Sequence, residues 1–163
     1  FTLATYSDPI ITGADWGVAM MFRLTSGVLL VALTVGIHSL VLGWCISRLR
    51  LDRGITTEGF LADTWLLSRL AVWAVFAHLL EISLWALFYV WQGVMPELET
   101  ALYFSGVTYA TIGYGDVIPP ADWRLLAAME GLTGILMCAW SGGFVFAVVS
   151  RMYFPDQRRQ PGP

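Results

Sequence analysis

Six residues, Thr111 to Asp116, read TIGYGD and form the stretch for which a chemical role can be argued most directly. They lie between two long apolar runs. Glycine leaves the backbone uncovered and adopts conformations that other residues avoid. Backbone without regular hydrogen bonds is tolerated at membrane depth only inside protein or beside water. The stretch therefore predicts a protein-lined or water-lined site at membrane depth.

A second group of candidate residues is ionisable and lies inside an apolar run. His78 and Glu81 are three positions apart, so one face of a helix presents both side chains. Ionisable groups at such depth have a partner or a function. We favour a hydrogen-bonded structural pair. A zinc site is the alternative, but zinc needs three or four ligands and the only other histidine is His38.

The elements that position these residues follow from composition. Hydrophobic residues make up 57% of the chain and charged residues 13%, against roughly 45–50% and about 25% in ordinary globular domains. Three runs exceed the roughly 20 apolar residues that cross a bilayer: Leu24–Ser47, Leu70–Val94 and Leu125–Ser150. We expect an all-α membrane protein with three transmembrane helices.

The distribution of arginine predicts the orientation, whereas the net charge of −3 says little about partners. All basic residues are arginines, and most of them flank the first connection or follow the third run: Arg48, Arg50, Arg53, Arg69, Arg151, Arg158 and Arg159. The positive-inside rule makes these regions cytoplasmic. The N-terminus and the connection 92–124 then lie outside, with Arg23 and Arg124 as exceptions at outer helix ends. We expect a multi-pass protein of the cell membrane, of the bacterial inner-membrane type.

The outer connection contains a sequence that predicts one further, shorter helix. Pro96 precedes ELETALYFSGVTYAT, which can form a helix of about three to four turns, too short to span. Glu97 and Glu99 suit its positive N-terminal end. The pattern predicts a re-entrant half-helix whose negative C-terminal end attracts cations toward the membrane centre.

The nine residues TYATIGYGD, Thr108 to Asp116, closely resemble the filter sequence of potassium channel pore domains with one pore loop per chain. The first span is an addition to that pattern. The resemblance implies that carbonyl groups, with the Thr111 hydroxyl, replace the hydration shell of K⁺, which is a permeating ligand rather than a cofactor. The carbonyls are those of Thr111, Ile112, Gly113 and Tyr114. Gly113 and Gly115 permit the backbone angles that point these carbonyls at one axis.

The resemblance also implies surroundings for the filter. Tyr114 is expected to pack outward against the pore helix, and Asp116 to attract cations at the outer mouth. One strand supplies a quarter of each oxygen ring, so the resemblance implies a homotetramer.

Several positions depart from the family pattern. Tyr103 and Phe104 stand where many members carry paired tryptophans around the filter. Val107 replaces an acid that bonds to the filter aspartate in some members, so Asp116 needs another partner such as Trp123. The predicted filter support consists of Tyr103, Phe104, Thr108, Trp123 and Glu130.

Two positions in the third run, Glu130 and Gly134, are expected to have further roles. Glu130 is expected to face the back of the pore helix and accept hydrogen bonds there, with direct lining of the ion path as the alternative. Gly134 resembles the hinge glycine of the family. If it marks the bend, four positions share one face toward the ion path: Ile135, Cys138, Gly142 and Phe146.

Phe146 lies near the cytoplasmic end of the third run. Four copies of it are expected to form an apolar ring that stops ions by dewetting. In the alternative arrangement Phe146 packs against the second span, and Phe144 or Val149 faces the axis.

The predicted units are 1–66, with the outer segment, first span and cytoplasmic link; 67–152, the pore module; and 153–163, the tail. We expect a passive K⁺-selective channel that is not an enzyme, lies in membrane lipids and binds no nucleic acid, with a regulatory partner or domain left open. Three alternatives remain: a weakly selective cation channel, an intramembrane metalloenzyme, and a non-conducting assembly subunit. The metalloenzyme would use His38, His78, Glu81 and Glu130.

Overall fold

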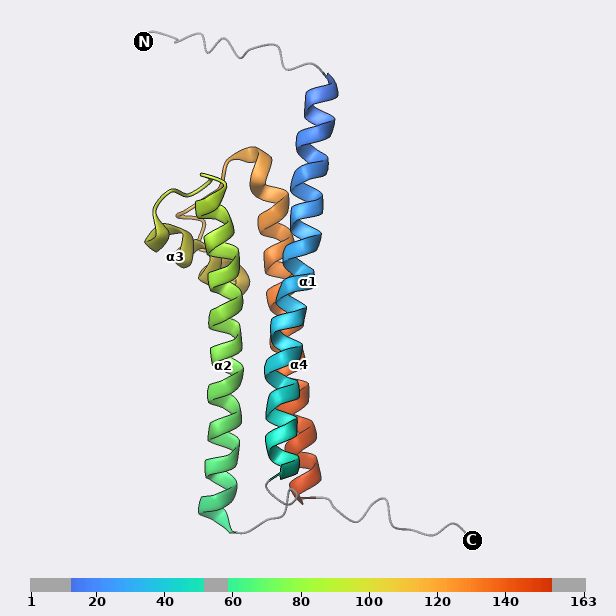
Figure 1. The fold of residues 1–163 in the computed structure, drawn as a ribbon. Coiled ribbons are helices and arrows are strands. Elements are labelled where there is room, and N and C mark those ends of the chain that lie inside the picture. The colour runs from blue at the N-terminus through green and yellow to red at the C-terminus, as the bar shows by residue number, and fades with distance from the viewer. Residues whose placement is uncertain (1–12, 52–58, 154–163) are drawn as a thin grey trace.

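A computed structural model describes residues 13–51 and 59–153, and these are helical with short connections (Figure 1). The elements are α1 Gly13–Leu51, α2 Phe60–Trp91, α3 Leu98–Tyr109, the 3-10 turn η1 Ala121–Trp123, and α4 Arg124–Tyr153. The expectations for the N-terminal arm, the centre of the first connection and the tail fall outside the described residues.

Three of these helices are long and apolar enough to cross a membrane. The candidate spans are Trp16–Arg48, Phe60–Trp91 and Ala121–Tyr153, with 33, 32 and 33 residues. Many large apolar side chains along them are exposed, such as Leu40 and Val72, as expected for surfaces that face lipid or another chain. The prediction of an all-α, multi-pass membrane protein is confirmed, and the spans are longer than the sequence limits indicated.

The C-terminal end of α2 differs from the predicted end of the second span. The second span was expected to continue to Val94, but the helix ends at Trp91. Gly93 has φ +68, and its N–H donates to the Val90 carbonyl at 3.0 Å, while the Val94 N–H donates to Tyr89 at 3.0 Å. This pair of bonds is the Schellman arrangement, which stops a helix where glycine adopts a left-handed conformation.

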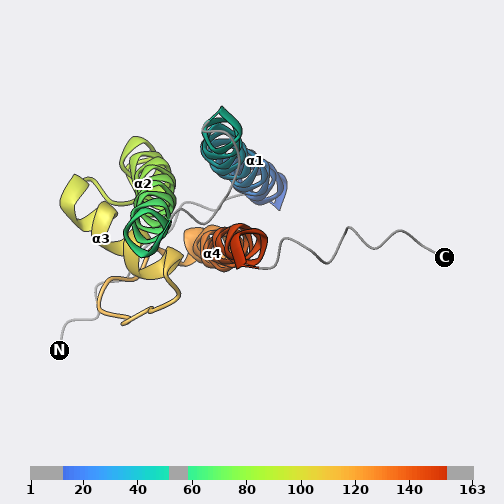
Figure 2. The same cartoon turned by 90° about the horizontal axis from the view of Figure 1, so that it is seen from below.

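The long helices lie side by side, and α3 is attached at one end. Figure 2 shows α1 on the side of α2 and α4 that is turned away from the loop following α3. α1 contacts both α2 and α4, and α3 packs against the same two helices. α1 is therefore peripheral to the module that α2, α3 and α4 build.

Two apolar clusters hold the helices together at opposite ends. The cluster beside α3 contains Leu30, Trp85, Ala86, Tyr89, Met95, Ala101, Phe104 and Leu126. These residues come from α1, α2, α3, α4 and the Val94–Met95 turn, so the cluster holds α3 against the long helices. Burial of each large apolar side chain stabilises the fold by roughly 1.5–3 kcal/mol. The second cluster, at the other end, contains Cys45, Leu70, Val148 and Met152.

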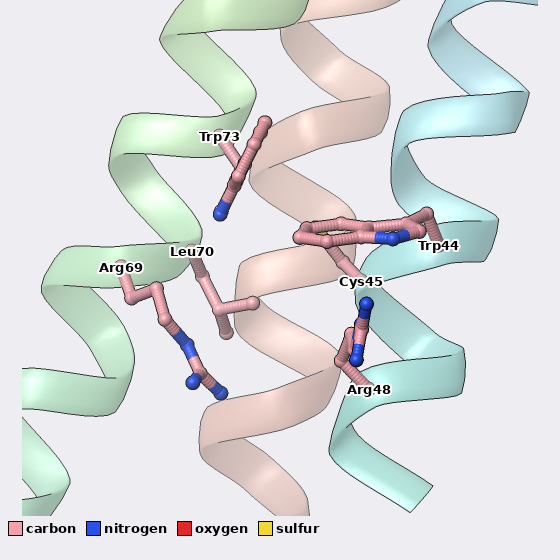
Figure 3. Close-up of a pocket in the computed structure, with 6 residues that line it drawn as sticks. All are labelled: Trp44, Cys45, Arg48, Arg69, Leu70 and Trp73. Atoms are coloured by element: carbon pink, nitrogen blue, oxygen red, sulfur yellow. The ribbon is translucent and has the colours of Figure 1, made fainter. Parts of the chain in front are cut away.

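A cavity of about 290 Å³ opens beside the second cluster. Its lining residues come from α1 and α2 (Figure 3): Trp44, Cys45, Arg48, Arg69, Leu70 and Trp73. The Trp44 and Trp73 rings meet edge to face at 4.5 Å between centroids, and the Arg48 guanidinium lies 5.3 Å above the Trp44 ring. Tryptophan and arginine with this arrangement are typical of the membrane–water interface.

Candidate functional site

The site begins at α3, which delivers the chain to the glycine stretch. α3 has 12 residues, an extended N-cap at Glu97 and an acid, Glu99, in its first turn. Negative charge there stabilises the positive end of the helix. The helix ends at Tyr109, and only the C-cap residue Ala110 separates it from Thr111. The predicted short helix of three to four turns is confirmed.

The backbone after α3 alternates between two conformations. Thr111, Gly113 and Gly115 have φ +58, +53 and +77, whereas Ile112 and Tyr114 between them do not have positive φ. Positive φ is easy for glycine but costly for a β-branched residue such as Thr111. Strain of this kind persists where surrounding contacts impose it, and it is concentrated at functional sites.

Three amide groups of this stretch are tied to the end of α3. The Thr111 N–H donates to the Thr108 carbonyl at 2.9 Å, and the N–H groups of Ile112 and Gly113 donate to Val107 at 2.8 and 3.1 Å. All described peptide bonds are trans, and in a trans peptide the C=O points opposite to the N–H. The carbonyls that precede these amides belong to Ala110, Thr111 and Ile112, and they therefore point away from the end of α3. They form a row of oxygen atoms on the free side of the loop.

Asp116, at the end of the glycine stretch, has hydrogen-bond partners other than the expected Trp123. The Tyr103 hydroxyl donates to Asp116 Oδ2 at 2.6 Å, and the Val117 N–H donates to Oδ1 at 3.1 Å. The hydrogen bond from Tyr103 lowers the pKa of Asp116 and raises the pKa of the phenol itself. The expected partner Trp123 is wrong, because Tyr103 lies one turn into α3 on the side facing the loop.

Trp123 has another position. It belongs to η1, where its ring packs edge to face on Phe88 and lies 5.3 Å beneath the Arg23 guanidinium. Arg23 also pairs with Asp122 at 2.9 Å. These contacts tie the outer end of α1 to the start of α4.

Two aromatic residues near the filter are not placed as expected within one chain. Tyr114 is 70% exposed, so it does not pack against its own pore helix. Phe104 is buried and packs edge to face on Tyr89, 5.4 Å between centroids. It therefore fixes α3 to α2 and supports the filter only through that helix.

Gly134 lies against the end of the pore helix. A methyl group added there would come within 2.0 Å of the Tyr109 carbonyl oxygen, and one added at Gly131 within 3.4 Å of the Thr108 oxygen. α4 continues as one helix through Gly134. The structure therefore gives Gly134 a packing role, close approach of two backbones, which the hinge interpretation did not include.

Glu130 is fully buried one turn before Gly134. It accepts a hydrogen bond from the Tyr89 hydroxyl at 3.0 Å. By hydrogen-bond geometry, its second oxygen and the Ser105 hydroxyl have no direct partner among the described residues. Because no part of it is exposed, it does not line an ion path in this chain, which argues against the alternative of direct lining.

The face predicted for the ion path is free in the single chain. Ile135 and Phe146 are 53% and 71% exposed, and Cys138 and Gly142 are also exposed. Phe144 instead packs against the second apolar cluster. The alternative in which Phe146 packs on the second span is therefore wrong for this chain.

The ionisable residues at membrane depth form one closed group, which we call the buried polar cluster: His38, His78, Glu81, Tyr109 and Ser141. Glu81 accepts from His38 Nδ1 at 2.9 Å and from the Tyr109 hydroxyl. The Tyr109 oxygen is also 3.1 Å from His78 Nδ1. Ser141 Oγ lies 3.1 and 3.2 Å from the Nε2 atoms of His38 and His78.

This cluster enlarges the predicted pair. His78 Nδ1 and Glu81 Oε2 are 3.5 Å apart, but their hydrogen bonds run to the other members, so α1, α2, α3 and α4 all meet here. Ligand atoms of His38, His78 and Glu81 lie within 4.8 Å of one another. Glu130 is not among them, so the described residues do not bring together the four ligands of the metalloenzyme alternative.

Ser141 and Tyr109 were not identified from the sequence as members of this site. Serine and tyrosine are common enough in helices that neither residue alone is a signal. Position along the spans could have identified Ser141, since His38, His78 and Ser141 fall near the middles of their apolar runs and so lie at a similar depth in the membrane. Polar groups at one depth in adjacent spans are expected to find one another.

Three spans, a re-entrant helix and a loop with its carbonyls turned away from that helix define a channel-type pore module. Residues 72–151 match the family described as "Ion channel". The matched segment lies within the predicted unit 67–152, and the match supports the resemblance to potassium channel pore domains that the filter sequence indicated.

Three curated relatives show the same similarity. The chain is 40% identical to Protein LctB of Geobacillus stearothermophilus over 65 residues, 40% of this chain and 43% of that protein. It is 35% identical to the voltage-gated potassium channel Kch of Escherichia coli strain K12 over 80 residues, 47% and 19% of the two chains. It is 48% identical to Protein LctB of Bacillus caldotenax over 42 residues, 26% and 31%. The matched segment thus spans less than half of each relative, and no solved structure matches the chain.

Proposed function

We propose that this protein conducts K⁺ passively and selectively across a membrane. The observation that carries the proposal is the orientation of the Thr111 and Ile112 carbonyls, which the amide hydrogen bonds to Val107 turn away from α3. Backbone carbonyls can replace the hydration shell of K⁺, and such rings are the basis of K⁺ selectivity. The name of the Escherichia coli relative, a potassium channel, agrees with this proposal.

One chain supplies one row of oxygens, so the proposal includes a homotetramer around a central axis. The faces that would meet there are free, because Ile112 and Tyr114 are 53% and 70% exposed. Tyr114 would then pack against the pore helix of a neighbouring copy. Thr111, Ile112, Gly113 and Tyr114 would bind the ions, with Asp116 at the mouth.

The proposed orientation places the filter toward the external side of the cell membrane and the α1–α2 connection on the cytoplasmic side. Arg48, Arg69 and Arg151 lie at the helix ends remote from the filter, and cytoplasmic ends carry the excess of arginine. The N-terminus is then external and the C-terminus cytoplasmic.

Flux from proteoliposomes tests the function. Purified protein should pass K⁺ at least about a hundredfold faster than Na⁺ and be blocked by Ba²⁺, because a carbonyl cage fits K⁺ and not hydrated Na⁺. Equal K⁺ and Na⁺ flux would favour the weakly selective channel. Absence of flux from a purified tetramer would favour the assembly subunit, and a monomer would contradict the shared filter.

Phe146 is the proposed gate, since it is 71% exposed on the α4 face that is free for the axis. Phe146→Ser should raise resting K⁺ flux several-fold and leave the K⁺/Na⁺ ratio unchanged, because a polar ring stays wet. The matched control is Phe144→Ser, which removes a packed side chain and should destabilise the protein instead. A rise in flux with Phe144→Ser alone would show that the assigned helix face is wrong.

A further inference from the structure

The buried polar cluster connects the peripheral helix α1 to the base of the filter. His38 on α1 bonds to Glu81 on α2, which bonds to Tyr109 at the end of α3. Tyr109 is two residues before Thr111, and its backbone rests on Gly134. A change in the hydrogen bonds of the Tyr109 side chain therefore acts on the residue from which the filter departs.

The five contacts of the cluster form a closed ring, and each needs one hydrogen atom. Ser141 and Tyr109 supply one each, and a neutral imidazole supplies one, so His38 and His78 add two. With Glu81 ionised, four hydrogens serve five contacts. One further proton completes the ring.

That proton completes the ring from either of two positions. On an imidazole, His78 donates through both nitrogens, to Tyr109 and to Ser141, while Glu81 stays ionised. On Glu81, the carboxyl donates to Tyr109, which then donates to His78. In both arrangements the net charge of the cluster is zero, and without the proton it is −1.

Burial makes the neutral cluster the favoured state. His38 and Glu81 are fully buried, and a net charge in such a place is costly. The titratable groups that act electrostatically on Tyr109 or Glu81 from α4 are Cys138 and Glu130. Both would add negative charge on ionising, so both favour retention of the proton.

We propose that the buried polar cluster is a proton-binding site that holds the base of the selectivity filter, and that His38 thereby makes α1 a part of the filter support. The consequence for ion flow rests on the proposed channel function, whereas the proton site itself does not. The ring is complete at low pH. It loses one link when the ring proton is released as pH rises.

A metal ion fits the same atoms less well. The Tyr109 hydroxyl lies between His78 and Glu81 and bonds to both, so an ion shared by these ligands would have to displace it. The separation of 2.9 Å between His38 Nδ1 and Glu81 Oε1 is that of a hydrogen bond. Each potential ligand atom already has a partner.

Glu81→Gln provides a sharp test because glutamine copies the protonated carboxyl. Its carbonyl accepts from His38 and its amide donates to Tyr109, which completes the ring without a titratable proton. Raising the pH from 5.5 to 8.5 removes the histidine protons of the unfolded state in both proteins, which stabilises the folded state of both. The folded wild type also loses its ring proton over this range, whereas folded Glu81→Gln has none to lose, so the thermal midpoint of the wild type should rise by about 5 °C less than that of Glu81→Gln.

Two further variants complete the experiment. Ser141→Ala removes both Nε2 contacts, and the remaining three need no additional proton. Its midpoint should be lower than that of the wild type at every pH, and its pH response should lie closer to that of Glu81→Gln. Ser39→Ala is the matched control on α1, since its hydroxyl bonds only to Val35 of its own helix. It should respond to pH as the wild type does.

A pH response in Glu81→Gln equal to that of the wild type would overturn the proposal, and so would a Glu81→Gln protein that does not fold. Stoichiometric zinc or another transition metal in the purified protein would overturn it in favour of a metal site. K⁺ and Na⁺ flux, measured in parallel, separates the two proposals. Selective flux with no difference between variants refutes the proton site alone, whereas the expected midpoints without selective flux refute the channel function alone.

Discussion

Replacing Gly134 by alanine should abolish K⁺-selective flux and destabilise the protein. The added methyl would lie 2.0 Å from the Tyr109 carbonyl oxygen and 2.7 Å from its carbonyl carbon. Both atoms are backbone, so the contact cannot be relieved by a side-chain rotation. Overpacking of this kind costs typically about 1–3 kcal/mol. The end of α3 has to move, and the filter moves with it.

The matched control is Gly131→Ala, one turn earlier on the same face of α4. Its methyl would meet the Thr108 oxygen at 3.4 Å, an ordinary contact, and alanine favours a helix by up to about 1 kcal/mol over glycine. We expect stability and flux close to those of the wild type. Thermal unfolding and the K⁺/Na⁺ flux ratio, measured for both variants, check the prediction.

This experiment also separates packing from hinge bending. If Gly134 acts only as a hinge, alanine would stiffen α4 and alter the fraction of time the channel is open, while stability and selectivity stay normal. Unchanged unfolding and selectivity in Gly134→Ala would therefore contradict the close approach to Tyr109.

Most of the fold could be predicted because lipid imposes strong rules on sequence. Three long apolar runs and one short helix with acidic first-turn residues are legible in one dimension, and the structure contains all four. The end of α2 was missed by three residues because Val94 is apolar, whereas the conformation of Gly93 decides where the helix stops.

The contacts within the site were harder to predict because they depend on which residues meet across helices. The sequence identified Glu81 and His78, but the partners Tyr109 and Ser141 come from elements 28 and 63 positions away. Tyr103 was identified as a departure from the family pattern, yet its bond to Asp116 requires the relative position of α3 and the loop. A family resemblance shows which positions correspond, but it does not show which contacts a substituted residue makes.

The other prediction of large effect concerns the alternation of backbone conformation along the filter. Gly113 and Gly115 have φ +53 and +77, and an added Cβ at either position meets nothing within 4 Å. Any loss of function on substitution therefore reflects the backbone conformation itself rather than a clash within the chain. A left-handed conformation costs an L-residue roughly 1–2 kcal/mol, and in the proposed tetramer each carbonyl ring would carry that strain four times.

Gly113→Ala and Gly115→Ala should therefore insert and assemble but lose selectivity, with the K⁺/Na⁺ flux ratio falling at least about tenfold, the equivalent of 1.4 kcal/mol. Alanine relieves its strain by turning the adjoining peptide groups, which moves their carbonyls out of the row. Gly106→Ala is the control, because Gly106 lies within α3, its φ is not positive and a methyl there meets nothing within 4 Å. Its flux ratio should match the wild type. Normal selectivity in both filter variants would show that the alternating conformation of residues 111–115 does not set the positions of the ion-binding oxygens.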